Sequence, residues 1–259
     1  MVDGRYIYCI VGEPFKEQYG TSAINGLESE VRTVRFRDIG AVVSSLPPDV
    51  HKVSTTRKNM LAHQRVMEEV MKGTPILPVK FGTVAEPSGD GDTEDRIRSR
   101  VLEERYQELA DLLAEMRGKV ELGLKVLWVD IKTIYREIVA ENPRIARLRS
   151  KVNRTPESGS YQSKVTLGEN VKNALDGKRA GEAGAMMKAL KAACVEYREN
   201  NIFGDRMVMN GAFLVQSELA DEFDAIVERL KEENDGRVLF RYLGPVPPSN
   251  FVELTITWE

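Results

Sequence analysis

The residues best suited to chemistry are few in this chain and stand far apart. His51 and His63 are its only histidines, and Cys9 and Cys194 are its only cysteines. A zinc site needs several His or Cys ligands at short spacing, and a catalytic nucleophile needs a base beside it. His63 falls at the edge of an apolar face of an expected helix, which favours a packed, hydrogen-bonded histidine over a ligand or a base. His51 stands in a loop and is expected to be solvated.

The acidic stretch at residues 90–95 (DGDTED) has some calcium-binding character. It fails the EF-hand pattern, because Asp95 stands where the loop needs glycine and Val101 where the bidentate glutamate belongs. A helix-capping loop is the favoured interpretation, with Glu94 and Asp95 at the positive end of the helix dipole. The chain also lacks the glycine patterns of phosphate-binding loops and the G-x-S-x-G turn of serine hydrolases. We therefore predict no metal, no cofactor and no catalytic site.

Two further sets of side chains are candidates for partner-binding surfaces. The first is a basic run, and the second is a set of methionines at helical spacing, Met60, Met67 and Met71. Core packing is favoured for the methionines, and a solvated helix face for the basic run, followed by a protein-docking face and then by nucleic acid. RNA is disfavoured because the run lacks interleaved aromatic residues and the chain has a net charge of −3. The basic run comprises Arg144, Arg147, Arg149, Lys151 and Arg154.

The closing segment carries the most distinctive pattern, a Gly-Pro-x-Pro-Pro turn at residues 244–248. Proline fixes φ and removes a backbone donor, so we expect a stiff corner that joins neither a sheet nor a helix. Strands are expected on both sides, at 237–243 and 251–258. The corner is a candidate partner interface, together with two arginines of the basic run. The residues of this predicted interface are Tyr242, Pro245, Pro247, Pro248, Phe251, Arg144 and Arg147.

Composition places the chain among globular proteins. Its 259 residues favour two domains, and 42% of them are hydrophobic. No apolar run approaches the ~20 residues that span a bilayer, and no secretory signal opens the sequence. Two distant cysteines are typical of a reducing compartment. We therefore expect a cytoplasmic protein that binds neither membrane nor nucleic acid.

Hydrophobic periodicity predicts the elements that position these residues. Helices are expected at about 55–72, 95–117, 131–200 (with breaks, and a helix at 181–199) and 217–235, and residues 12–26 are expected to form a loop. The order predicts an α+β fold with helices on one face of each sheet, and a ferredoxin-like arrangement in both halves. The predicted domains are 1–118 and 119–259, the second with a helical insertion at about 131–200. Strands, besides the two that flank the closing corner, are expected at 6–11, 31–36, 39–45, 76–81, 120–129 and 207–216.

The absence of a credible reactive grouping favours an interaction or assembly protein over an enzyme. Several segments, taken in order, sharpen this interpretation because together they resemble the gas vesicle protein family F/L. The resemblance covers nearly the whole chain. Its segments are residues 5–10 (RYIYCI), 61–71 (LAHQRVMEEVM), 76–84 (ILPVKFGTV), 118–128 (GKVELGLKVLW) and 242–252 (YLGPVPPSNFV).

The resemblance implies a non-enzymatic accessory protein for building gas vesicles, found in the cytoplasm and at the gas vesicle. It implies a modified ferredoxin-like N-terminal domain and a ferredoxin-like C-terminal domain. It also implies binding to the small hydrophobic shell protein and to other accessory proteins. The residues by themselves leave three alternatives open: a ligand-sensing regulator, an RNA-binding module, and an enzyme whose site is built from scattered residues.

Overall fold

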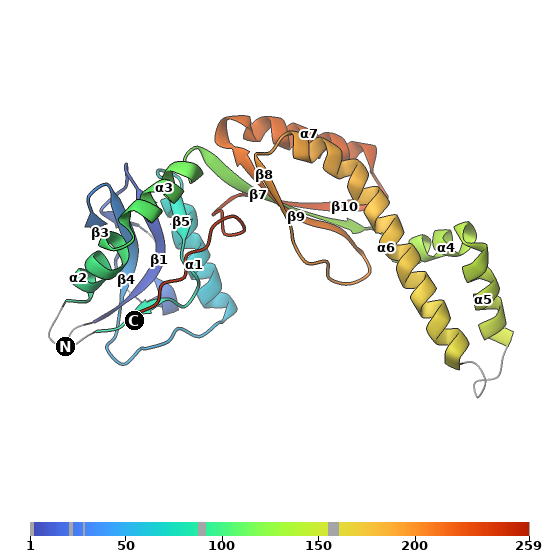
Figure 1. The fold of residues 1–259 in the computed structure, drawn as a ribbon, viewed down its shortest axis with the longest axis horizontal. Coiled ribbons are helices and arrows are strands. Elements are labelled where there is room, and N and C mark those ends of the chain that lie inside the picture. Colours follow the sequence, from blue (N-terminus) through green and yellow to red (C-terminus); the bar gives the residue numbers. More distant parts are fainter. Residues whose placement is uncertain (1–2, 21–22, 28, 88–91, 155–160, 259) are drawn as a thin grey trace. The chain divides into compact units, whose positions relative to one another are not determined.

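The computed structural model shows an α+β protein with two antiparallel sheets (Figure 1). It describes residues 3–20, 23–27, 29–87, 92–154 and 161–258. The chain divides into two compact units. Unit 1 comprises residues 1–121, 216–218 and 244–259, and unit 2 comprises residues 122–215 and 219–243. The last sixteen residues, which the sequence placed in the second domain, therefore pack with the first unit.

Unit 1 is built on a sheet with the order β2-β3-β4-β1-β5, and β6 also pairs with β1. The central strand β1 is buried on both faces, as its unbroken apolar sequence predicts. The elements of unit 1 are β1 (Gly4–Gly12), β2 (Gln18–Tyr19), η1 (Ile24–Gly26), β3 (Val31–Phe36), β4 (Ile39–Leu46), α1 (Arg57–Val70), β5 (Ile76–Pro78), β6 (Val84–Ala85), α2 (Thr93–Ile97), η2 (Arg98–Glu103) and α3 (Tyr106–Met116).

Helices cover both faces of this sheet, so the expectation of a one-sided arrangement is wrong for unit 1. Tyr6 and Tyr8 share a core cluster with residues of α1. Ile7 and Ile10, which are fully buried, lie outside that cluster, on the face where α3 packs against β1, β4 and β5. A bulge between Ile7 and Cys9 shifts the alternation of side chains along β1.

Helix α1 begins where the sequence predicted, because the Thr56 hydroxyl accepts a hydrogen bond from the Asn59 amide. Its buried stripe contains His63 and Met67, as expected, but Met60 is exposed. The next helical region begins at Asp92, whose carboxylate caps the Glu94 amide. This capping bears out the helix-start interpretation of the acidic stretch from residue 92 onward, whereas residues 90 and 91 lie outside the described residues.

Unit 2 contains a four-stranded sheet with the order β10-β7-β9-β8. Strand β7 enters it from the end of unit 1, and its Leu124, Val126 and Trp128 are fully buried. The remaining elements are β7 (Lys119–Trp128), α4 (Ile131–Glu141), α5 (Pro143–Arg154), α6 (Tyr161–Ala192), β8 (Glu196–Glu199), β9 (Met207–Gln216), η4 (Ser217–Leu219), α7 (Ala220–Glu233) and β10 (Val238–Val246).

Four local predictions in unit 2 and at the chain's end are corrected. The helix expected at 181–199 is the end of α6, which stops at Ala192, and residues 196–199 pair with β9. The helix expected from residue 217 begins as α7 at Ala220, with the exposed Leu219 at its N-cap. Pro245 lies inside β10, which tolerates proline because it is an edge strand. Residues 251–258 form a single bridge in place of a strand.

Helices α4, α5 and α6 form an arm within unit 2, and each contacts the other two. Lys178 of α6 pairs with Glu137 of α4 at 3.0 Å and with Glu141 at 2.8 Å. The base of the arm is tied to the sheet by Trp128, whose indole N–H donates to Glu182 at 2.8 Å. No helix among the described residues combines the length and apolar composition needed to cross a membrane.

Candidate protein-interaction site

His63 lies in an aromatic cluster of unit 1. Its ring stacks on Tyr8 and meets Tyr6 and Phe81 edge to face. The Tyr6 hydroxyl lies 3.0 Å from His63 Nδ1 and accepts a hydrogen bond from the Gly82 amide at 3.1 Å. Burial lowers the pKa of His63 to about 4, so the imidazole is neutral at physiological pH. The expectation of a packed, hydrogen-bonded histidine is confirmed.

The proline-rich corner is largely an internal feature of unit 1. Pro247, Pro248 and Phe251 are buried. The amides of Phe251 and Val252 both donate to the Pro248 carbonyl at 2.9 Å, which closes a tight turn. Because these residues are buried, they support the surface of unit 1 from inside and expose little area that a partner could contact.

A buried carboxylate fixes the tip of this corner. Glu121, which is 3% exposed, accepts hydrogen bonds from the backbone amide of Asn250 at 2.9 Å and from its side-chain amide at 2.5 Å. Beyond the corner, the Leu254 amide donates to the Pro78 carbonyl and the Leu254 carbonyl accepts from Lys80. The closing segment is thereby attached to the edge of the unit 1 sheet.

The other predicted interface residues lie elsewhere. Tyr242 is half-buried in unit 2, where its ring stacks on Phe223 and its hydroxyl donates to Asp224. Pro245 is exposed. Arg144 and Arg147 are exposed on α5. The structure thus groups Pro247, Pro248 and Phe251, and it places Tyr242 and the two arginines on separate elements of unit 2.

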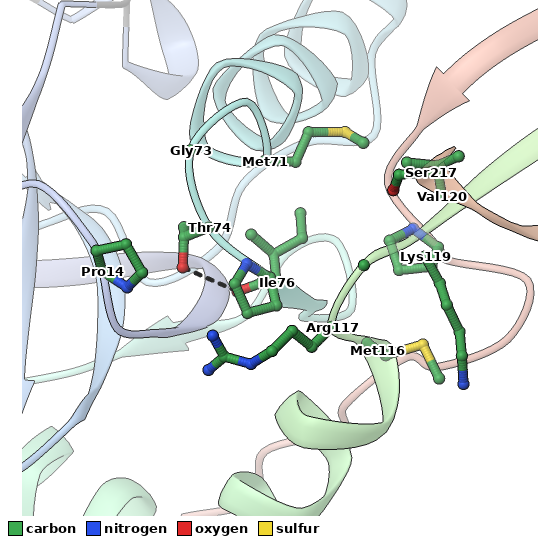
Figure 2. A pocket seen from close by; sticks show the side chains of 13 residues that line it. Pro14, Met71, Gly73, Thr74, Ile76, Met116, Arg117, Lys119, Val120 and Ser217 are labelled. Carbon is green, nitrogen blue, oxygen red and sulfur yellow. Dashed lines mark hydrogen bonds between the residues drawn. The ribbon is translucent and has the colours of Figure 1, made fainter. Parts of the chain in front are cut away.

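A hollow of about 260 Å³ opens on unit 1 beside the proline corner (Figure 2). Its apolar part comes from the end of α1, the start of β5, the end of α3 and the start of β7. Arg117 and Lys119 add two basic side chains, and Arg117 donates to the Glu13 carbonyl at 3.2 Å. The apolar lining includes Met71, Ile76, Met116, Val120 and Pro248.

This hollow is suited to binding. None of the described residues lining it is a histidine, a cysteine or a carboxylic acid, and most of its side chains are apolar. Two methionines give it an adaptable apolar lining. Elsewhere in the described chain, no group of three or more His, Cys, Asp or Glu side chains is placed to hold a metal ion.

Sequence reasoning missed most of this hollow. Of its lining residues, the sequence indicated Pro248 as part of a partner interface, whereas Met71 was expected in the core. The chain turns from α3 into β7 at Gly118, which has a φ of 69°. This turn brings three neighbouring side chains to the hollow, those of Met116, Arg117 and Lys119. The sequence indicates this turn, because the helix expected at 95–117 ends immediately before Gly118. Its position opposite Met71 and Pro248 depends on the tertiary fold.

The chain is thus an α+β protein with two antiparallel sheets, and its first unit carries a hollow lined by apolar and basic side chains. Comparison with known proteins then gives the family. The chain belongs to the gas vesicle synthesis protein GvpL/GvpF family, which it matches over residues 4–253, and it therefore has a role in gas vesicle formation. This match confirms the resemblance found in the sequence.

Individual relatives support the assignment along the whole chain. Gas vesicle protein F of a Streptomyces species is 32% identical over 83% of this chain and 84% of its own. Gas vesicle protein F1 of Halobacterium salinarum is 26% identical over 100% of this chain and 97% of its own. The crystal structure of GvpF from an Anabaena species has a TM-score of 0.81 at 21% identity, covering 97% of this chain and 99% of that one.

Proposed function

We propose that this protein is a non-enzymatic accessory protein of gas vesicle formation, which binds the small hydrophobic shell protein and other accessory proteins during nucleation or assembly. It acts in the cytoplasm and at the gas vesicle. The observation that carries the proposal is the family match over residues 4–253, which spans both units. Beyond the family membership, the proposal adds the binding partners and the absence of catalytic activity.

The physics of shell assembly supports this proposal. A subunit of a gas-filled shell needs a strongly apolar face, and that face invites aggregation before assembly. An accessory protein that shields the subunit needs an apolar contact of its own. The hollow beside the proline corner supplies one, with Met71 and Lys119 partly exposed and the buried Met116 among its lining residues.

We place the shell-protein contact at this hollow. Pro247, Pro248 and Phe251 support its shape from within unit 1. Tyr242 and Pro245 lie on edge strand β10 and remain proposed contacts for other accessory proteins. Arg144 and Arg147 lie on the arm and remain part of the proposed partner interface.

We further propose that the two units are variants of the ferredoxin-like fold. Unit 2 supports this directly, since its order is strand, helices, strand, strand, helix, strand, which is the βαββαβ pattern. Unit 1 departs from it by adding β2 and β3 at one edge and by placing helices on both faces. An experimental structure with a different strand order in unit 2 would contradict this assignment.

The test is co-purification with the shell protein from cells that express both. Met71→Glu/Lys119→Glu puts two acidic groups into the hollow, and both positions are partly exposed, so the variant is expected to fold. Recovery of the shell protein should fall about tenfold or more, as burying an unpaired charge in an apolar contact predicts.

The matched control is Arg65→Glu on the solvent face of α1, which should bind as the wild type does. Circular dichroism and the melting temperature show whether each variant is folded. Full recovery of the shell protein by a folded Met71→Glu/Lys119→Glu variant would remove the hollow from the interface.

A further inference from the structure

The arm of unit 2 is strongly basic although the protein is acidic. Residues 131–192 contain thirteen Lys and Arg and six Asp and Glu, whereas the rest of the chain contains 24 Lys and Arg and 34 Asp and Glu. The excess is concentrated on α5, which has five basic residues and no acidic one. All five basic side chains are exposed.

Four of these side chains form one stripe. Arg144, Arg147, Lys151 and Arg154 are separated by three, four and three residues, which places them on one face of a helix. The stripe is about 15 Å long at 1.5 Å per residue. Neither Arg144 nor Arg147 pairs with a carboxylate among the residues that the structure describes.

The same unit presents an acidic counterpart on α7. This helix has six Asp and Glu against two Lys and Arg. Its exposed Asp221, Glu228 and Glu232 are separated by seven and four residues, so they too share one face. This second stripe is about 16 Å long, close to the length of the first.

The two stripes do not meet within one molecule. Helix α5 packs on α4 and on the part of α6 near its start, whereas α7 packs on α6 near its end (Figure 1). Both stripes are exposed to solvent, and within the acidic one Glu228 also pairs with Lys231 of the same helix.

We propose that the basic stripe of α5 binds the acidic stripe of α7 on a second copy of this protein, so that copies associate head to tail. A second copy fits better than nucleic acid, because α5 carries no aromatic residue for base stacking and the chain as a whole repels a polyanion. The two patches differ, so the interface is heterologous and extends into open chains unless the rotation closes a ring. The inference is independent of shell-protein binding.

The association should be weak and sensitive to salt, since exposed ion pairs are individually weak and are screened. Sedimentation of the purified full chain tests it. At low salt and several hundred micromolar protein, the weight-average mass should rise to about twice the 29.1 kDa of the monomer or more. In about 0.5 M NaCl, where the Debye length is about 4 Å, it should return to the monomer value.

Charge reversal identifies the surfaces. Arg144→Glu/Arg147→Glu/Arg154→Glu reverses the basic stripe, and Asp221→Lys/Glu228→Lys/Glu232→Lys reverses the acidic one. Each variant alone should stay monomeric at low salt. An equimolar mixture should associate again, because each reversed stripe then meets its complement. Lys164→Glu/Lys172→Glu/Lys188→Glu on α6 changes the net charge as much as the first variant does, and it should associate as the wild type does.

Three outcomes overturn the proposal: a wild type that stays monomeric, an association unchanged by both reversals, or a mixture of folded variants that stays monomeric. Binding of RNA or of an acidic peptide to the basic stripe, with no change in the protein's own mass, also counts against it. Monomeric variants that still co-purify with the shell protein would leave the proposed function intact.

Discussion

At the residue scale, burial determines the protonation of His63. In the neutral tautomer that carries its proton on Nε2, Nδ1 accepts from the Tyr6 hydroxyl, whose oxygen also accepts from the Gly82 amide. Protonation of the ring would place a charge in this buried aromatic cluster, and this loss of solvation lowers the pKa of His63.

His63 should make stability depend on pH below neutrality. The unfolded chain binds a proton near pH 6.5 and the folded chain only near pH 4, so protonation favours the unfolded state. The free energy of unfolding is thus highest above pH 6.5 and falls as the pH drops toward 4. Between pH 7.5 and 5 the loss is about 2 kcal/mol, measurable by urea denaturation.

His63→Gln should flatten this part of the profile. The control is His51→Gln, because the His51 side chain is 63% exposed and should leave the profile unchanged. A wild-type stability that is constant from pH 7.5 to 5 would show that His63 is not buried in its neutral form.

At the element scale, the arm is held to the unit 2 sheet by charged hydrogen bonds around Arg237. Its guanidinium donates to both carboxylate oxygens of Glu137 at 3.0 Å and to Glu182 at 2.6 Å. The hydrogen bond from Arg237, followed by one from Lys178, lowers the pKa of Glu137 to about 2. Glu182 joins this network to the buried indole of Trp128, so it links α6, β7 and the start of β10.

Glu182→Ala should lower the free energy of unfolding by about 1–3 kcal/mol, because the buried Trp128 N–H loses its acceptor. Glu182→Gln keeps a carbonyl acceptor and should lose less. The fluorescence of Trp128 should change with Glu182→Ala, and urea denaturation gives the free energy. Glu169→Ala, at an exposed position of the same helix, is the comparison, and equal stabilities of the two alanine variants would contradict the prediction.

At the scale of the whole molecule, the chain returns to its first unit after completing the second. The closing segment joins the edge of β5 through Leu254, which is 5% exposed and bridges Val79. The N-terminal residues therefore do not form a complete unit without the C-terminal ones. The domain boundary predicted after residue 118 lies close to residue 121, where the first segment of unit 1 ends. Residues 216–218 and 244–259 also belong to unit 1, so one division of the chain at this boundary separates segments that pack together.

Removal of residues 251–259 should destabilise unit 1 by about 4 kcal/mol, since it exposes the surfaces that Phe251 and Leu254 cover. Urea denaturation and hydrogen exchange at Val79 and Lys80 measure the effect. A shorter truncation of residues 257–259 keeps the Leu254 bridge, removes the contact of Trp258 with Arg96, and should cost less than about 1 kcal/mol. Equal unfolding midpoints for the two truncations would show that the bridge contributes nothing.

The bounds of the helices and strands were predicted accurately where the local sequence pattern is strong, and poorly where it is weak. Strands β3 and β9 were predicted to the residue, and β4 and β7 to within one residue, because their patterns are bounded by turn residues. The end of α6 was missed, since residues 196–199 lack a strand pattern of their own and pair only because β9 lies beside them.

The sequence alone determined the class of this protein. The scarcity of histidine and cysteine, the periodic apolar residues and the ordered family segments are properties of the chain itself, and they led to an α+β member of a gas vesicle family. The tertiary structure decided which side chains share a surface. Pro248, Met71 and Lys119 line one hollow and Phe251 is buried because packing brings together segments distant in sequence, and local periodicity carries no information about such contacts.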